Sequence, residues 1–274
     1  MNIGAHVSIA GGITNAPGNA AAIGCECFQI FTRSPRGGPA RPITTETGEA
    51  FRAECRRYGL ADCYIHTPYY INLASTDRRI ADSSVKVVRE ELERGCAVGA
   101  RAVMTHLGST GASRRDVALR RVSRNIRKIL KNYEGKTQLL LELAAGSGSI
   151  VGSSFEELAL VTRDSDGGCG VCLDTQHMFA SGYDIRGIKK VTETFDRFDE
   201  VVGMGLLQLI HANDSKVPSN SRRDRHEHIG EGKIGKQGFR ALIADKRLSR
   251  IDFILETRHD RVADDIRLLK SLRG

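Results

Sequence analysis

Histidine and carboxylate side chains recur at the ends of short apolar segments of this chain. Each stands at the last position of an apolar run or directly after it, and imidazole and carboxylate groups are ligands for divalent metal ions. Burying several of them together would be costly without a compensating cation. We therefore predict a metal centre that contains His66, His106, Glu142, Asp174, His211 and Glu256.

Two local clusters add further candidate ligands. His177 lies three positions after Asp174, and Asp224 and His226 lie two apart in a polar segment. The alternatives are an ordinary N-terminal helix residue for His177 and a solvated charge run for the other two. Together the candidates exceed the three or four ligands of one Zn²⁺, and with a bridging carboxylate they could hold three ions. A donor set without thiolate suits Zn²⁺ or Mn²⁺, and the sequence does not choose between them.

The apolar runs that carry these residues are expected to be β-strands. Each run is bounded by a turn signal and followed by an amphipathic stretch. Because the runs are apolar on both faces, they suit parallel strands buried between a core and covering helices. The expected strands are Ile3–Val7, Cys27–Phe31, Cys63–Ile65, Ala102–Thr105, Leu139–Leu143, Gly170–Leu173, Leu206–Ile210 and Asp252–Leu255.

Eight βα units in 274 residues predict an α/β fold, the TIM (β/α)₈ barrel, as a single domain over residues 1–274. A doubly wound open sheet has the same local pattern and remains an alternative. In a barrel all strand carboxyl ends open on one face, so the candidate ligands would converge there. The segments Ser34–Gly48, Ala144–Ser154 and Ala212–Gly238 are interpreted as long βα loops.

Two helices are indicated most clearly between these strands. One follows Asp82, because Val85, Val88, Leu92 and Cys96 share one helical face. Another is expected to begin at Ser113, where Asp116 completes the pattern of a capping box. It would turn Val122, Ile126, Ile129 and Leu130 inward, and its many arginines are interpreted as a solvated outer face.

Composition narrows the class of protein. A hydrophobic share of 40% and a charged share of 27% exclude intrinsic disorder, and the formal charge of +8 favours a polyanionic partner. The seven cysteines are odd in number and scattered, which predicts a reduced, cytoplasmic protein. Cys169 and Cys172 are interpreted as buried packing. We expect neither a signal peptide nor a membrane span.

Longer motifs run nearly end to end along the chain. They read IGAHVSIAGG (3–12), FQIFTRSPR (28–36), IHTPYYINLAS (65–75), THLGS (105–109), LLLELAAGSGS (139–149), GVCLDTQHMFASGYD (170–184), HANDSK (211–216), DRHEHIGEGKIG (224–235) and LET (255–257). In this order they resemble the endonuclease IV family, the metal-dependent apurinic/apyrimidinic endonucleases of base-excision repair.

The resemblance implies three metal ions, normally zinc, with Mn²⁺ an option at one or more sites. His66, His106 and Glu142 would hold the first ion, and Glu142 would bridge to a second ion held by Asp174, His211 and Glu256. The third would be held by His177, Asp224 and His226. The implied reaction is hydrolysis of the phosphodiester 5′ to an abasic site in duplex DNA, which leaves a 3′-hydroxyl and a 5′-deoxyribose phosphate. Glu142 would also orient or deprotonate the nucleophile.

The resemblance also implies that the abasic nucleotide is flipped out of the stack and that loop residues act as wedges. Arg36 and Tyr69 stand at the wedge positions, so we predict that they contact DNA. The chain departs from the family here, since it has no large aromatic residue beside Arg36 and no Trp. His228 and His259 are not at matched ligand positions, and His6 is expected to support ligands. We expect a monomer.

Two other functions remain open at this point. A sugar isomerase or epimerase on the same barrel would bind one Mn²⁺ or Mg²⁺, but it would leave the five remaining candidate ligands without a role. A non-catalytic DNA-binding barrel with structural metals would bind abasic duplex without cutting it. The candidates that an isomerase would use are Glu142, Asp174, His211 and Glu256.

Overall fold

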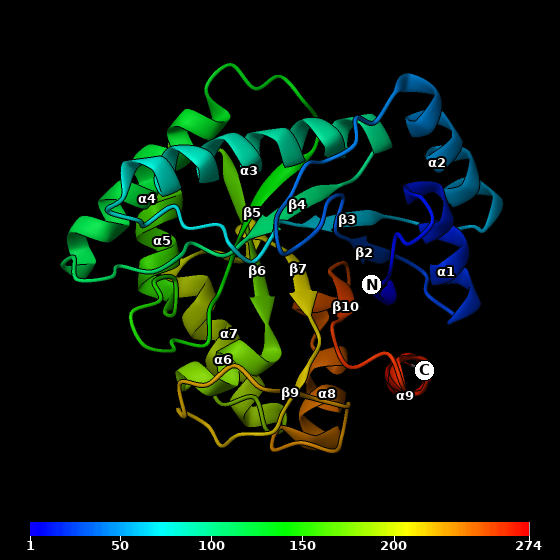
Figure 1. Cartoon of the computed structure of the whole chain (residues 1–274). Coiled ribbons are helices and arrows are strands. Elements are labelled where there is room, and N and C mark those ends of the chain that lie inside the picture. The colour runs from blue at the N-terminus through cyan, green and yellow to red at the C-terminus, as the bar shows by residue number, and fades with distance from the viewer. Residues whose placement is uncertain (274) are drawn as a thin grey trace.

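The eight apolar runs form the parallel strands of a closed barrel (Figure 1). The computed structural model describes residues 1–273. Each predicted strand is present with ends that differ by one residue at most, and β1 pairs with both β2 and β10, so the sheet closes and the open-sheet alternative is excluded. The barrel strands are β1 Ile3–His6, β2 Phe28–Ile30, β3 Cys63–His66, β4 Ala102–Thr105, β5 Gln138–Glu142, β6 Cys169–Asp174, β7 Leu207–His211 and β10 Asp252–Leu255.

Helices surround these strands on the outside (Figure 1). Among residues 1–273, none of them is both long and apolar enough to cross a membrane. Short 3₁₀ turns lie at Ile13–Asn15, Met204–Leu206 and Lys246–Leu248. The α-helices are α1 Ala16–Ala22, α2 Thr45–Arg57, α3 Arg78–Val98, α4 Arg115–Leu130, α5 Phe155–Asp164, α6 Thr175–Ser181, α7 Ile188–Val201, α8 Gly235–Ala244 and α9 Val262–Arg273.

A cluster of buried apolar side chains fills the inside of the barrel. Side chains alternate between the two faces of a strand, so the residue two positions further along each strand also faces inward. Cys172 belongs to this inner cluster and Cys169 to the outer one, and both are free, so they do not form a pair. The inner cluster is Cys27, Tyr64, Ala102, Met104, Leu140, Cys172, Leu209 and Ile254.

Two expectations about helix starts were wrong. Helix α3 begins at Arg78 rather than after Asp82, because the Asp77 carboxylate accepts the backbone N–H of Arg79 at 2.8 Å and caps the helix. No capping box forms at Ser113: the N-cap of α4 is Arg114, which makes no side-chain cap. Of the residues expected inward on α4, all are buried except Leu130, which is only partly buried.

Most arginines of α4 make contacts within the protein. Arg120 pairs with Asp116 at 2.7 Å, one helical turn away, and Arg121 donates to the carbonyl of Ala74 at 2.6 Å. These contacts support the interpretation of this helix as an outer surface rather than a DNA patch.

The long segments are more structured than their polar composition indicated. Helix α2 already begins at Thr45, inside the expected loop, because Thr44 Oγ1 accepts the N–H of Thr47. The segment 212–238 contains a two-stranded antiparallel hairpin and the start of α8. The hairpin strands are β8 Asp214–Ser215 and β9 His226–Glu227. Strands of two residues are too short to produce a recognisable pattern, so the sequence predicted only a loop.

Candidate metal centre

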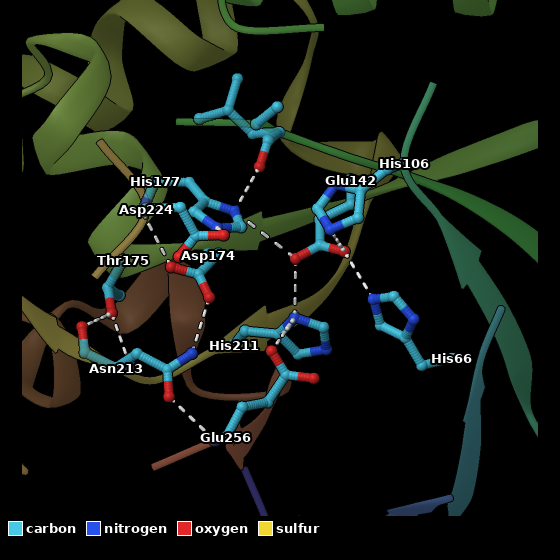
Figure 2. A network of polar contacts seen from close by, with 12 residues as sticks. His66, His106, Glu142, Asp174, Thr175, His177, His211, Asn213, Asp224 and Glu256 are labelled. Atoms are coloured by element: carbon cyan, nitrogen blue, oxygen red, sulfur yellow. Dashed lines mark hydrogen bonds and ion pairs between the residues drawn. The ribbon is translucent and has the colours of Figure 1, made fainter. Parts of the chain in front are cut away.

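The six strand-end candidates meet at the carboxyl ends of the barrel strands. Each stands two positions after a member of the inner apolar cluster, as in Tyr64 and His66 or Leu140 and Glu142, so the period of the strand turns it inward. Figure 2 shows these six side chains pointing towards one another. His66, Glu142, Asp174 and His211 end their strands, and His106 and Glu256 follow β4 and β10.

Glu142 lies at the centre of this arrangement and is fully buried. Its Oε2 is 3.1 Å from His66 Nε2 and 3.4 Å from His106 Nε2. Its Oε1 is 2.9 Å from His211 Nδ1 and 3.6 Å from His177 Nδ1. The two oxygens therefore face two different groups of histidines, which is the position that a bridging carboxylate needs.

Four groups of donor atoms among residues 1–273 could hold an ion, and three of them consist of candidate ligands only. The fourth joins the Cys172 thiol, a member of the inner apolar cluster, to Glu142 and His211. In each group the donor atoms lie within 4.8 Å of one another, the separation expected of groups that could share an ion. Asp174, and not Asp224, completes the group around His177 and His226. Asp224 nevertheless lies 3.3 Å from His177 Nε2 and 3.4 Å from His226 Nε2. The three groups are His66, His106 and Glu142; Glu142, Asp174, His211 and Glu256; and Asp174, His177 and His226.

Mutual charge sets the protonation of these groups. Burial alone would raise the pKa of Glu142, but the charges of His106 and His211 hold it well below its usual range. Burial of Glu256 is likewise outweighed, chiefly by the charge of His211, and its pKa is about 2. Burial would lower the pKa of His177, yet the charge of Asp174 and the nearby Asp224 carboxylate raise it to about 10. Glu142 and Glu256 are thus ionised, as ligation requires, and a bound cation would replace the proton of His177.

Two buried nitrogen atoms test whether the site fits a metal. His177 Nδ1 donates to the carbonyl of Leu143 at 2.8 Å, so the neutral imidazole, the form that binds a metal, carries its proton on Nδ1 and its lone pair on Nε2. His177 Nε2 and His226 Nε2 are both buried without a hydrogen-bond partner among residues 1–273. Buried polar atoms are costly to leave unpaired. A divalent ion between these imidazoles and Asp174 would give both Nε2 atoms a partner. The residues of this site therefore fit a bound metal ion.

Two supporting residues were missed by the sequence reasoning. Gln29 on β2 is fully buried; its Nε2 donates to Glu256 Oε1 at 2.6 Å and its Oε1 accepts from His211 Nε2 at 2.8 Å. Asn213 donates to Asp174 Oδ2 at 2.6 Å and accepts the backbone N–H of Glu256 at 2.8 Å. A polar residue inside an apolar run, as in FQIF, was the available signal for Gln29.

The remaining histidines lie outside the three groups. His6 accepts a hydrogen bond from Gln29 Nε2 at 3.0 Å, which agrees with the expected supporting role. His228 Nδ1 lies 2.7 Å from a carboxylate oxygen of Asp265 on α9, away from the candidate ligands. His259 is exposed and lines the cavity beside them.

The candidate ligands open into a cavity of about 490 Å³ that is lined by His66, His106, His177, Asp224, His226 and Glu256, among others. Tyr69 stands at its rim with 69% of its surface exposed, and its ring lies edge-on to Phe31 at 5.3 Å. The N–H of Tyr69 donates to the carbonyl of Pro35 at 3.3 Å, so its loop adjoins the one that carries the exposed Arg36. Tyr69 is therefore on the rim, and Arg36 is exposed on the neighbouring loop.

The fold and this arrangement define the class of protein. Residues 17–272 match the family model described as xylose isomerase-like TIM barrel, and the chain belongs to that family. The predicted barrel is thereby confirmed. The fold by itself is shared with enzymes of other chemistry: a D-tagatose 3-epimerase-like protein has a TM-score of 0.74 at 18% identity, and this likeness concerns the fold alone.

Closer relatives identify the branch. Probable endonuclease 4 of Chlorobium phaeobacteroides is 40% identical over 275 residues, which cover 98% of this chain and 96% of the relative. Probable endonuclease 4 of Carboxydothermus hydrogenoformans is 36% identical and covers 100% of this chain and 96% of the relative. The crystal structure of endonuclease IV from Thermus thermophilus has a TM-score of 0.88 at 34% identity, with 99% and 98% of the two chains covered. The chain belongs to the endonuclease IV family, and the predicted enzyme class, a hydrolase of this family, is confirmed.

Proposed function

We propose that this enzyme is a DNA-repair endonuclease that hydrolyses the phosphodiester 5′ to an abasic site in duplex DNA. The products are a 3′-hydroxyl and a 5′-deoxyribose phosphate. The observation that carries the proposal is the convergence of nine His, Asp and Glu side chains, six of which line one cavity, in a member of the endonuclease IV family. A single-metal isomerase would leave five of them without a role.

The nine side chains would hold three metal ions, zinc in our proposal, with Mn²⁺ an option at one or more sites. Bound divalent ions lower the pKa of a bound water, neutralise phosphate charge and stabilise a departing oxyanion. Glu142 would serve two groups, because its oxygens face different histidines. Asp224, which contacts both imidazoles of the third group, would join Asp174 there. The ligand set is His66, His106, Glu142, Asp174, His177, His211, Asp224, His226 and Glu256.

The side chains of this enzyme position these donors and handle the proton of the nucleophile. Glu142 is buried and ionised, so it can orient a water molecule or accept its proton. Gln29 orients Glu256 and His211 through hydrogen bonds. At the rim, Arg36 and Tyr69 would fill the gap left in the duplex when the abasic nucleotide is flipped out. A second cavity of about 410 Å³, which shares Tyr69 and His106 with the first, offers room beside the donors for that nucleotide.

The proposal includes a single-domain monomer that works in the cytoplasm. The seven cysteines are free, in agreement with a reducing compartment.

The test is a metal analysis of untreated protein together with an incision assay. We expect about three ions per chain, incision of an abasic duplex, no incision of the undamaged duplex, and loss of activity after chelation. One ion per chain with epimerisation of a ketose would establish the isomerase instead. Three ions with tight binding of abasic duplex but no cleavage would establish the non-catalytic alternative.

A further inference from the structure

The residues of the third metal group are supported differently from the others. His226 lies on β9, whose only ladder partner among residues 1–273 is the two-residue strand β8, with Ser215 opposite His226 and Asp214 opposite Glu227. A two-stranded ladder is at best marginally stable in isolation, and this one is far shorter than an ordinary hairpin. Something besides the ladder must hold β9 against the barrel.

Asp214 on β8 provides that support. Its side chain is fully buried, and its carboxylate accepts backbone N–H groups from Gly230 at 2.9 Å, Gly232 at 3.1 Å and Ile234 at 2.9 Å. The N–H groups of Ser215, at 2.7 Å, and Gly235, at 3.1 Å, complete an amide cage of five donors. No Lys, Arg or His side chain within residues 1–273 pairs with this carboxylate, so backbone amides are its hydrogen-bond partners there.

The cage gathers the chain that follows β9. The segment 230–235 folds back over β8, where Lys233 N also donates to the carbonyl of Ser215 at 2.7 Å. This close approach requires Gly232, because a Cβ there would lie 2.4 Å from Asp214 Oδ1 and 2.5 Å from the carbonyl oxygen of Ser215. Asp214 thus joins the strand before the long segment to the chain after it, and His226 is held between them.

We propose that Asp214 is a positioning residue for the third metal ion, a role that rests on the proposed function. Its carboxylate does not belong to any of the three candidate groups. Through the amide cage it fixes β9 and with it the direction of His226 towards Asp174 and His177. The two other groups lie on or directly after barrel strands that donate no hydrogen bond to this carboxylate, so we expect their ions to depend on it much less.

The test compares Asp214→Asn with wild type, both purified with their metals. Asparagine presents an NH₂ group to N–H donors, so the cage loses acceptors while the volume stays nearly the same. We expect the variant to keep two ions firmly and to bind the third about ten- to a hundredfold more weakly, the usual cost of losing a group that orients a ligand. Metal content after gel filtration and the rate of metal loss to a chelator measure this directly, and added Zn²⁺ should restore incision.

Matched variants separate this role from general destabilisation. Asp252→Asn removes another buried carboxylate, which accepts from Asn2 and Tyr64 at the opposite end of the barrel, and should retain all three ions. If Asp214→Asn does not fold, Gly232→Ala disturbs the same cage, with Gly205→Ala, whose added Cβ meets nothing within 4 Å, as its control.

The outcomes are distinct. Folded cage variants that keep three ions at the wild-type rate of loss would overturn the role of Asp214. Loss of all three ions together would also overturn it, since the effect would then be global. Wild-type protein with fewer than three ions would instead contradict the proposed function.

Discussion

Two regions of the site present the same kinds of ligand by different means. The strand-end donors, such as Glu142 and His211, inherit their positions from a closed and continuously hydrogen-bonded sheet. The loop-borne donors, Asp224 and His226, depend on a two-residue hairpin and the Asp214 cage. Donors of the same chemical type can therefore differ in how rigidly they are held. A donor on a barrel strand is fixed by many hydrogen bonds of the sheet, whereas a donor on a loop is fixed by few.

Exposure follows the same division. The side chains of Glu142 and His211 are completely buried, whereas 22% of the His226 side chain and 55% of the Asp224 side chain are exposed. An ion held partly by exposed, loop-borne donors is more accessible to water and chelators. We therefore expect the third ion to exchange fastest, and variants in the two regions test this contrast.

The largest effect is expected from Glu142→Gln, which removes the charge from the centre of the strand-end region. Incision of an abasic duplex should fall by roughly 10⁴-fold, the upper end of the range for loss of an acid–base group. The measurement is single-turnover incision, with the exposed Glu134→Gln as a control that keeps the wild-type rate. If Glu142→Gln cleaved abasic duplex at a rate within tenfold of wild type, Glu142 would have no essential role in the reaction.

A second prediction sets one histidine of each region against the other. His211→Ala removes a donor that contacts both Glu142 and Glu256, so incision should fall by about 10³-fold and the second ion should be lost. His226→Ala should lose only the third ion, with incision reduced by about 10²-fold and partly restored by added Zn²⁺. Metal content and activity against Zn²⁺ concentration measure both. Equal losses in the two variants would show that the regions do not differ.

The third prediction concerns the stability of the metal-free protein as a function of pH. The pKa of His177 is raised to about 10 by Asp174 and Asp224, so its stabilising effect is complete below its unfolded pKa of about 6.5 and disappears as pH rises through 10. The pKa of Glu256 is lowered to about 2, so its contribution is present above about 4.5 and is lost as pH falls through 2.

The metal-free protein should therefore be most stable between about pH 4.5 and 6.5, and its melting temperature should fall by several degrees towards pH 10. Metal-loaded protein should show a smaller fall, because bound cations replace the proton of His177. Thermal unfolding followed by circular dichroism measures both forms. A metal-free melting temperature that is constant from pH 6.5 to 10 would contradict the prediction.

The smallest effect is expected at the rim. Tyr69→Ala should weaken binding of abasic duplex by about tenfold, the cost of one lost stacking side chain, and leave the metal content at the wild-type value. This variant tests whether loss of metal is specific to the β8–β9 hairpin or follows from a change in any loop around the site. Fluorescence anisotropy measures binding, and Tyr58→Ala, an exposed tyrosine of the α2 end, serves as the control. Loss of metal from Tyr69→Ala would contradict a role limited to DNA.

Much of the barrel region could be predicted because its information is local. An apolar run that ends at His66 or Glu142 predicts both a strand and the residue at its carboxyl end. Once the sheet closes into a barrel, the two-residue period of the strand turns that side chain inward. The helix boundaries were less predictable: Asp77, rather than Asp82, caps α3, and the sequence offers both aspartates five positions apart.

The order of residues was sufficient to specify the eight strands, the residue types at their ends and the family to which the chain belongs. The folded chain was needed to show that Asp174 completes the group around His177 and His226, that Gln29 and Asn213 orient ligands, and that the Asp214 cage gathers the chain around β9. The physical reason is range. Strand periodicity acts between neighbours in the chain, whereas these contacts join residues tens to hundreds of positions apart, and only the folded backbone sets the angles at which they meet.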